Sequence, residues 1–386
     1  MQSNFVPYSP EIESIDPEIE KYMTRIIDFW EKAVRESPTR EGTGHALRGA
    51  HAKTLGVVRA EVEIFGDLPA PYAQGIYARP GRHDAVIRFS SANNHLGPDA
   101  QLGPVLGFAI KIFGIEGSKL VDDEPASSTF DLVLKNNPTF VANTARRYVV
   151  LQEVGNDSGK YLARGKEGFR ELLTDLLTGK GTFEQKDWAW EETFAFVKAA
   201  QTPIQNPLLT PYWTMAAMRH GDYVAKVRVA PVAESATHAI HRRLDIKSRP
   251  DVFGPVLQDE LRASAFEFDL QVQLCTNLEA MPVNDATVEW REELSPFVTV
   301  GRVRLPSQDI SAHQRSEQAD ALAFNQWRVT AEHRPLGEIM QVRRIYSASA
   351  KVRRALNHQP QCEPMSADEV LPGPQLDDQS GRLAEV

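Results

Sequence analysis

The sequence predicts an α+β protein built around a closed antiparallel β-barrel, with flanking helices and a further helix near the C-terminal end. About seven short segments have strand-like patterns, in two groups on either side of a helical insertion at about residues 144–200. Clusters of Gly, Pro, Asn and Asp between the segments favour turns and antiparallel pairing. Closing such a sheet into a barrel would remove its exposed edges.

The predicted elements follow in a simple order. Apolar residues recur at helical spacing over residues 15–37, and Asp16 ahead of Pro17 supplies a start signal. The barrel is expected over about residues 45–305, with strands at 57–65, 85–91, 107–113, 129–134, 222–230, 265–274 and 297–305. A last helix at about 336–356 would complete a single domain over residues 1–356. The Pro-rich, polar tail at 357–386 is predicted to be extended or disordered.

Charge and composition exclude several classes of function. The formal net charge of −9 argues against nucleic-acid partners and against a polybasic membrane surface. No apolar run approaches the roughly 18 residues that a membrane span needs. Residues 1–13 lack a basic region followed by an apolar stretch, so we expect no secretory signal and a cytoplasmic location. Cys275 and Cys362 are too few for a cysteine-built zinc or iron–sulfur site, and are interpreted as unrelated thiols.

Three residues attract attention, although none is specific alone. Arg88 interrupts the apolar face of a predicted strand, and a buried arginine needs an anionic partner. His51 is one of ten histidines, and Tyr346 lies on a basic helix, where a tyrosine is usually packed against a neighbour.

The order of the motifs is more informative than any one of them. Arg-Gly-Ala-His-Ala-Lys at 48–53 precedes the first strand, and Val-Ile-Arg-Phe-Ser at 86–90 forms the second. Gly-Phe-Ala-Ile-Lys at 107–111 follows, and then Asp-Leu-Val at 131–133, which leads to Asn-Asn-Pro-Thr-Phe at 136–140. Arg343, Tyr346 and Arg353 stand far downstream. This series resembles the haem catalases in order and spacing, over roughly residues 45–356.

The resemblance implies a haem b cofactor held by a defined set of residues. Tyr346, on the C-terminal helix, would be the iron's axial ligand as a phenolate, stabilised by Arg343 three residues earlier. His51 would move a proton between the two oxygens of the peroxide, leaving a ferryl haem. Asn136 would hold the peroxide, and Phe140 would form part of the distal wall. The haem propionates would pair with three arginines, Arg48, Arg88 and Arg353.

This sequence also departs from the catalase pattern. The large catalases place the arginine four residues before the tyrosine, not three. Alignment without gaps puts Lys135 at the position of the catalytic amide, so that Asn136 or Asn137 would have to fill it by a one-residue slip, and Asn136 is preferred. Ala50 and Ala92 stand where large catalases have valines, which suggests a wider access route. The family's large C-terminal additions are missing, so the chain resembles the minimal catalase-like type.

The resemblance leaves more than one function open. The first hypothesis is a haem-dependent oxidoreductase that decomposes hydrogen peroxide, with peroxidase activity and use of organic hydroperoxides, working as a homo-oligomer. The second is a haem enzyme that converts fatty-acid hydroperoxides, as allene oxide synthase does. The third is a haem-binding sensor or carrier without turnover, against which the distal His51 and Asn136 argue.

Overall fold

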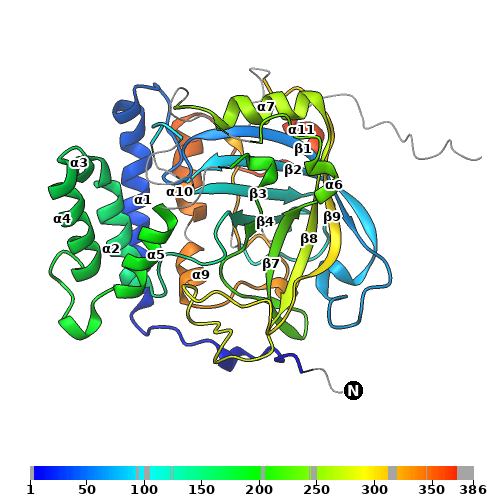
Figure 1. The fold of residues 1–386 in the computed structure, drawn as a ribbon, viewed down its shortest axis with the longest axis horizontal. Helices are drawn as coiled ribbons and strands as arrows, with labels where there is room; N and C mark the ends of the chain where they lie inside the picture. Colours follow the sequence, from blue (N-terminus) through cyan, green and yellow to red (C-terminus); the bar gives the residue numbers. More distant parts are fainter. Residues whose placement is uncertain are drawn as a thin grey trace, which may run out of the picture.

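The computed structural model describes residues 4–92, 95–99, 105–121, 123–124, 126–200, 205–242, 244, 250–311, 320–344 and 346–371, without the side chains of residues 156, 199 and 200. Its centre is one antiparallel sheet in the order β5-β4-β3-β2-β1-β9-β8-β7-β6 (Figure 1). A further pairing, between β5 and β7, closes eight of these strands into a barrel and leaves β6 at its margin. The predicted closed barrel is therefore confirmed.

The first half of the barrel comes from long strands joined in sequence order. These strands are β1 (Thr54–Ile64), β2 (Gly81–Ser91), β3 (Leu106–Ile112) and β4 (Phe130–Lys135). The second half contains β5 (Tyr212–Trp213), β6 (Met218–His220), β7 (Tyr223–Pro231), β8 (Phe266–Leu274) and β9 (Val298–Leu305). All seven predicted strands are present, whereas the two short ones, β5 and β6, were not predicted.

The interior of the barrel is filled by side chains. Successive residues of a strand point to opposite faces, so every second residue of β2, β3 and β4 joins the inner core. Phe89, Phe108 and Leu134 are examples, and none of the three has any exposed surface. Phe89 and Phe108 meet edge to face, with ring centroids 4.8 Å apart. Because the interior is packed, a ligand site has to lie outside the barrel wall.

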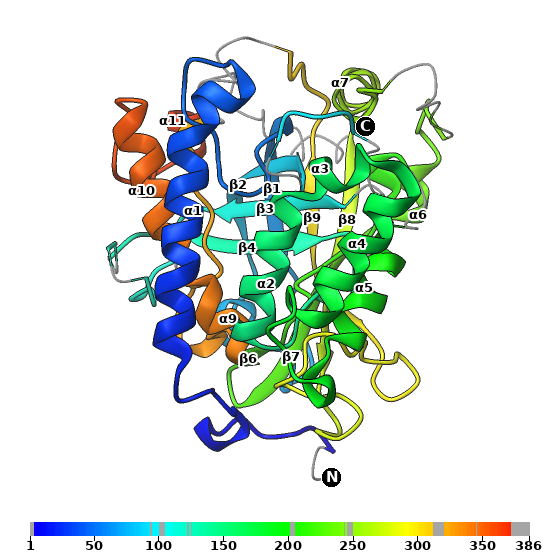
Figure 2. The same cartoon turned by 90° about the vertical axis from the view of Figure 1, so that its left-hand side faces the viewer.

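Helices cover one side of the barrel (Figures 1 and 2). The layer contains α1 (Ile19–Glu41), α2 (Ala145–Asn156), α3 (Ser158–Leu162), α4 (Gly165–Thr178) and α5 (Trp190–Ala200), together with α9 (Glu338–Arg343) and α10 (Tyr346–Leu356). Two further helices lie against the sheet: α6 (Ala233–Ala236) packs against β8 and α7 (Phe253–Ala263) against β1. No helix within the described ranges has both the length and the apolarity that crossing a membrane requires.

Two predictions near the C-terminal end need correction. The single helix expected at 336–356 is divided, because α9 ends at Arg343 and α10 begins at Tyr346. The tail is not extended or disordered from residue 357, because α11 (Ala367–Val370) buries Ala367 and Val370 against Val57, Val86 and Phe113 on the outside of the barrel. Residues 372–386 of the predicted tail lie outside the described residues.

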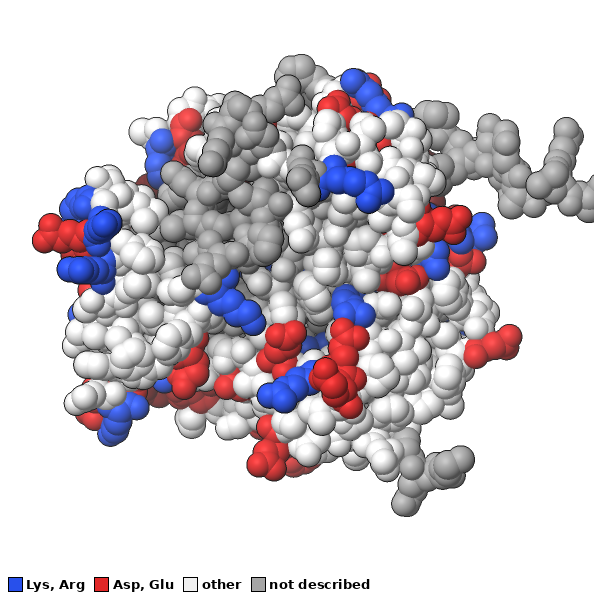
Figure 3. Space-filling view, viewed as in Figure 1, with Lys and Arg blue, Asp and Glu red and all other residues white. Residues whose placement is uncertain are grey.

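Charged residues of both signs are interspersed on the face of the molecule shown in Figure 3. The described part of that face shows no field of a single sign, and its acidic and basic side chains stand next to one another.

Candidate functional site

A cavity of about 670 Å³ lies between the outer face of β2–β4 and the helical layer. Its size is within the range of roughly 300–1,000 Å³ that is usual for small-molecule and cofactor sites. Six elements besides the three strands contribute lining residues: α1, α2, α3, α5, α9 and α10. The cavity brings together seven of the eight predicted site residues, namely Arg48, His51, Arg88, Phe140, Arg343, Tyr346 and Arg353.

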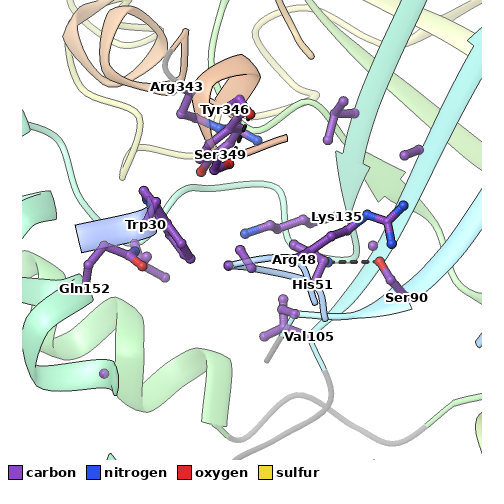
Figure 4. Close-up of a pocket in the computed structure, with 18 of the residues that line it drawn as sticks. Trp30, Arg48, His51, Ser90, Val105, Lys135, Gln152, Arg343, Tyr346 and Ser349 are labelled. Atoms are coloured by element: carbon purple, nitrogen blue, oxygen red, sulfur yellow. Dashed lines mark hydrogen bonds between the residues drawn. The ribbon is translucent and has the colours of Figure 1, made fainter. Parts of the chain in front are cut away.

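His51 lies in the turn that precedes β1, and its backbone has a positive φ of 52°. Its Nδ1 is 2.9 Å from Oγ of Ser90, so the histidine is oriented by a hydroxyl on β2 and presents Nε2 for other partners (Figure 4). Burial lowers the pKa of His51 well below its usual value, and the nearby cations Lys135 and Arg88 lower it further. The imidazole is therefore neutral and able to accept a proton.

Strand register explains how the contact between His51 and Ser90 is accommodated. Ser90 pairs with Gly107, and Gly107 pairs with Lys135, so the three residues form one row across β2, β3 and β4 on the cavity face. A Cβ atom at Gly107 would lie 2.6 Å from Oγ of Ser90 and 2.7 Å from Nδ1 of His51. Only glycine leaves room for the contact between these two side chains.

The same register places Lys135, and not Asn136, on the cavity. Oδ1 of Asn136 accepts a hydrogen bond of 2.8 Å from the backbone N–H of Leu106, and neither Asn136 nor Asn137 lines the cavity. Consecutive residues at the end of a strand point to opposite sides of the sheet. Shifting the alignment by one residue, from Lys135 to Asn136, therefore selects a side chain on the other face. Placing Asn136 on the peroxide side was therefore wrong, whereas the gapless alignment on Lys135 agrees with the structure.

Lys135 differs chemically from the amide expected there. Burial and the charge of Arg343 lower the pKa of Lys135 to about 7. Its Nζ lies 5.4 Å from the centre of the Phe140 ring. In Figure 4 its side chain extends into the space between Tyr346 on one side and His51 on the other.

Tyr346 begins α10 on the opposite side of the cavity from His51 (Figure 4). Its hydroxyl is 2.8 Å from that of Tyr148 on α2, and its ring meets Trp30 of α1 edge to face. Burial and the Tyr346 oxygen raise the pKa of Tyr148 well above its usual value, so Tyr148 remains a phenol that can donate to Tyr346. The Arg343 guanidinium lies 5.7 Å from the centre of the Tyr346 ring, which places a cation beside the phenol as predicted.

Three arginines meet at one end of the cavity. Nη2 of Arg88 donates to the His51 carbonyl at 2.7 Å and to Oγ1 of Thr54 at 2.8 Å, while Nη2 of Arg353 donates to the Leu322 carbonyl at 3.0 Å. Burial, together with the neighbouring Arg48, lowers the pKa of both Arg88 and Arg353 well below the usual arginine value.

Carboxylates near these arginines make few direct contacts with them in the described part of the chain. Asp320 approaches Arg48 to 3.5 Å, but no ion pair joins Arg88 or Arg353 to a carboxylate among the residues that the structure describes. Mutually repelling, buried guanidinium groups are costly unless an anion joins them. The trio therefore fits the two carboxylates of a haem, and Tyr346, with Arg343 beside its ring, would be able to supply a phenolate oxygen to the iron.

The cavity also has an apolar arm that the sequence motifs did not reveal. We use this name for the part of the lining that α2, α3 and α5 contribute, which includes Leu151, Gly155, Gly159, Leu162 and Phe196. Ala50 and Ala92, which suggested a wider route, also line the cavity. The helical periodicity of residues 144–200 was visible in the sequence, but not which of its faces would meet the barrel.

Comparison with known proteins gives a clear result for the fold only. No family model matches the sequence, and no curated protein matches it. Among solved structures, a fungal catalase superposes with a TM-score of 0.56 at 16% identity, covering 89% of this chain and 72% of that one. Catalase A from Saccharomyces cerevisiae gives 0.55 at 15% identity, covering 87% and 68%, and a bacterial catalase gives 0.55 at 16%, covering 94% and 67%.

The chain has a catalase-like fold. In this catalase-like barrel the sequence motifs lie where the resemblance placed them, on β2, β3 and β4 and on the helix that begins at Tyr346. Ser90, Gly107 and Tyr148 were not predicted. Ser90 could have been found from Arg88, because residues two apart on a strand share a face.

Proposed function

We propose that this protein is a haem-dependent oxidoreductase that decomposes hydrogen peroxide and uses organic hydroperoxides as well. The observation that carries the proposal is the opposition of two groups across one cavity. A tyrosine with a guanidinium beside its ring stands on one side, and a neutral histidine fixed by a serine stands on the other. The arginine trio supports a dicarboxylate cofactor between them.

Each residue on the cavity would have a separate role. Arg48, Arg88 and Arg353 would hold the haem propionates, and Tyr346 would bind the iron. Bound haem would supply the metal that exchanges electrons with the peroxide. His51 Nε2 would accept the proton of the near peroxide oxygen and return it to the far oxygen, which leaves as water. Ser90 would keep the imidazole in the orientation that this transfer needs.

Tyr346→Phe tests the metal ligand without relying on activity. The haem-loaded protein should show a ferric spectrum with phenolate charge-transfer bands, and the variant should lose these bands because it has no oxygen donor. Tyr161→Phe, which changes a phenol bonded to Asp175 on the helical layer, is the control and should keep them. An unchanged spectrum in Tyr346→Phe, or a wild-type protein that takes up no haem, would contradict the proposal.

His51→Ala tests the proton transfer. Oxygen evolution from hydrogen peroxide should fall by roughly 10²–10⁴-fold, the usual contribution of a general acid–base group. His238→Ala, at an exposed position, should evolve oxygen at the wild-type rate. Equal rates in wild type and His51→Ala would remove His51 from the mechanism. Absence of oxygen evolution by the haem-loaded wild type would instead favour a haem carrier.

The apolar arm favours one second candidate function, the rearrangement of fatty-acid hydroperoxides. Incubation with a lipid hydroperoxide and no reductant distinguishes the two functions. Disappearance of the hydroperoxide into a rearranged product, with little oxygen evolved from hydrogen peroxide, would make this candidate the principal activity.

A further inference from the structure

The charges around the cavity are not balanced by the groups assigned so far. Five cationic side chains line it, Arg48, Arg88, Lys135, Arg343 and Arg353, and no aspartate or glutamate is among the lining residues within the described ranges. The proposed haem would bring two carboxylates for the arginine trio and leave Arg343 for the Tyr346 phenolate. Lys135 then remains without an anionic partner.

Lys135 is not engaged elsewhere in the protein. No hydrogen bond or ion pair of its Nζ exists among the residues that the structure describes, and its Nζ stands over the face of Phe140. Lys111 lies on the neighbouring strand β3, four residues after Gly107. It shows the usual alternative, because it is buried in ion pairs with Asp131 at 2.7 Å and Glu363 at 3.2 Å. An ammonium among four guanidinium groups and without an anionic partner is costly, so its position suggests a ligand that supplies the charge.

Lys135 lies where the reactive part of the cavity meets the apolar arm. On one side, the row Ser90–Gly107–Lys135 places it beside the His51 pair. On the other side, Phe140 contacts Tyr148 with ring centroids 5.5 Å apart, and Tyr148 is on α2. Gln152 and Gly155 follow Tyr148 at helical spacing and also line the cavity.

The arm has room for a chain of methylene groups. A Cβ atom placed on Gly155, which is only partly exposed, would meet no atom within 4 Å, so the wall is open at this position. Leu151, Leu162 and Phe196 supply apolar surface along the same stretch. Transfer of each methylene from water to such a surface is favourable.

We propose that the cavity binds an amphipathic organic acid, with its carboxylate or peroxycarboxylate at Lys135 next to His51 and its hydrocarbon chain along the α2–α3 arm. This inference rests on the proposed function, whose peroxide substrates it narrows to those that carry an acidic group close to the peroxide bond. Lys135 is the residue that selects for the charge, and the arm selects for the chain.

The test compares decanoate with decanol, which have the same chain and differ in charge. Calorimetric titration of the haem-loaded protein at pH 6, where the Lys135 amine is protonated because its pKa is about 7, gives both affinities. Decanoate should bind at least about tenfold more tightly than decanol, as expected for one charge-assisted hydrogen bond. Lys135→Gln should remove this difference and Lys135→Arg should keep it, while Lys160→Gln, at an exposed lysine paired with Asp157, is the control.

Gly155→Leu tests the arm separately. The added side chain would project into the open part of the wall, so decanoate and decanol should both bind more weakly. Thr174→Leu, at an exposed position on α4, is the matched control and should leave both affinities unchanged. Circular dichroism verifies that each variant has the wild-type fold before it is titrated.

Three results would overturn the inference: equal binding of the two ligands to wild type, unchanged decanoate affinity in Lys135→Gln, or no effect of Gly155→Leu. Loss of decanoate binding in Arg88→Gln but not in Lys135→Gln would assign the carboxylate to the arginine trio instead. Failure of the proposed function would be recognised differently, because the protein would then take up no haem. A haem-loaded protein indifferent to decanoate would leave the proposed function standing and reject only this inference.

Discussion

The orientation of His51 depends on the absence of a single carbon atom. Gly107→Ala would place a methyl group 2.6 Å from Oγ of Ser90 and 2.7 Å from Nδ1 of His51, so the pair must separate. We expect peroxide turnover to fall at least about tenfold, because the general acid–base group loses its orientation, while the haem spectrum is retained. Gly66→Ala is a suitable control, since its nearest neighbour would be Pro80 at 3.8 Å. Wild-type turnover in Gly107→Ala would show that the serine contact is dispensable.

At the residue scale the sequence motifs located most of the residues on the cavity, but not Lys135, which is the least typical of them. The placement of Arg48, Arg88, Arg353 and Tyr346 on one cavity followed from motif order, since each belongs to a segment with a recognisable neighbour. Lys135 was passed over because a strand's final residue can face either way until its register is known. The pairing of Gly107 with Lys135 decides this, and no local pattern encodes it.

At the scale of elements, the segment after α10 is attached to the barrel by buried charges. Glu363 lies 2.6 Å from Arg354 on α10 and 3.2 Å from Lys111 on β3, and it also approaches Arg328 to 3.8 Å. These cations outweigh the cost of burial and lower the pKa of Glu363 to about 2, from a usual value of 4.5. The network connects the helix that begins at Tyr346 to the barrel wall.

Glu363→Gln should destabilise the protein in a pH-dependent way. A carboxyl whose pKa is lower in the folded state contributes stability above its unfolded pKa, and this is lost as pH falls through the folded pKa. Wild type should therefore lose up to about 3 kcal/mol from this group between pH 4.5 and 2. Urea unfolding at pH 7 and pH 3 should show a less stable variant with a weaker pH dependence than wild type, whereas Glu171→Gln, in an exposed pair with Arg164, should behave as wild type. A variant as stable as wild type at pH 7 would argue against the network.

Helix boundaries and the tail were the elements least accessible to sequence reasoning. The division between Arg343 and Tyr346 has no Gly or Pro to mark it. The segment that includes α11 is rich in proline and polar residues, which is typical of disorder, but its few apolar residues cover Val57 and Val86. Long-range contacts of this kind override local composition.

At the scale of the whole molecule, a strand of two residues closes the barrel. Trp213 of β5 pairs with Lys135 of β4 and with Arg228 of β7, and Tyr212 pairs with Val229. Tyr212 is fully buried, its ring lies 4.9 Å from that of Phe108, and its hydroxyl donates to the Pro207 carbonyl at 2.8 Å.

Tyr212→Ala should cost about 3–5 kcal/mol in unfolding free energy, because it leaves a large cavity beside the closure. Tyr212→Phe keeps the ring and loses only the hydrogen bond, so its cost should be about 1 kcal/mol. Urea unfolding followed by circular dichroism measures both values. Hydrogen exchange should also become faster in β4 and β5 of Tyr212→Ala, and equal costs for the two variants would contradict the role given to the ring.

The architecture was predictable because its main strands are long and regularly patterned, whereas the closing strand is not. Two residues cannot show a periodicity, so neither β5 nor its pairing could be found from sequence. Helix α7 was missed as well, although its apolar face is buried against β1. The choice of a closed barrel therefore rested on the general cost of free edges rather than on the segment that closes it.

The packed interior of the barrel has a consequence for how the ligand specificity of such a protein can be altered. Since the cavity is on the outside of the wall, its inner surface belongs to the rigid sheet, and the apolar arm belongs to a single stretch of helices between β4 and β5. The reacting groups on the barrel and the helices that form the apolar arm are thus encoded in separate parts of the chain. Exchanging only the stretch between Lys135 and Tyr212 for that of a related protein would be a direct way to alter which molecules are admitted while the reacting groups on the barrel stay in place.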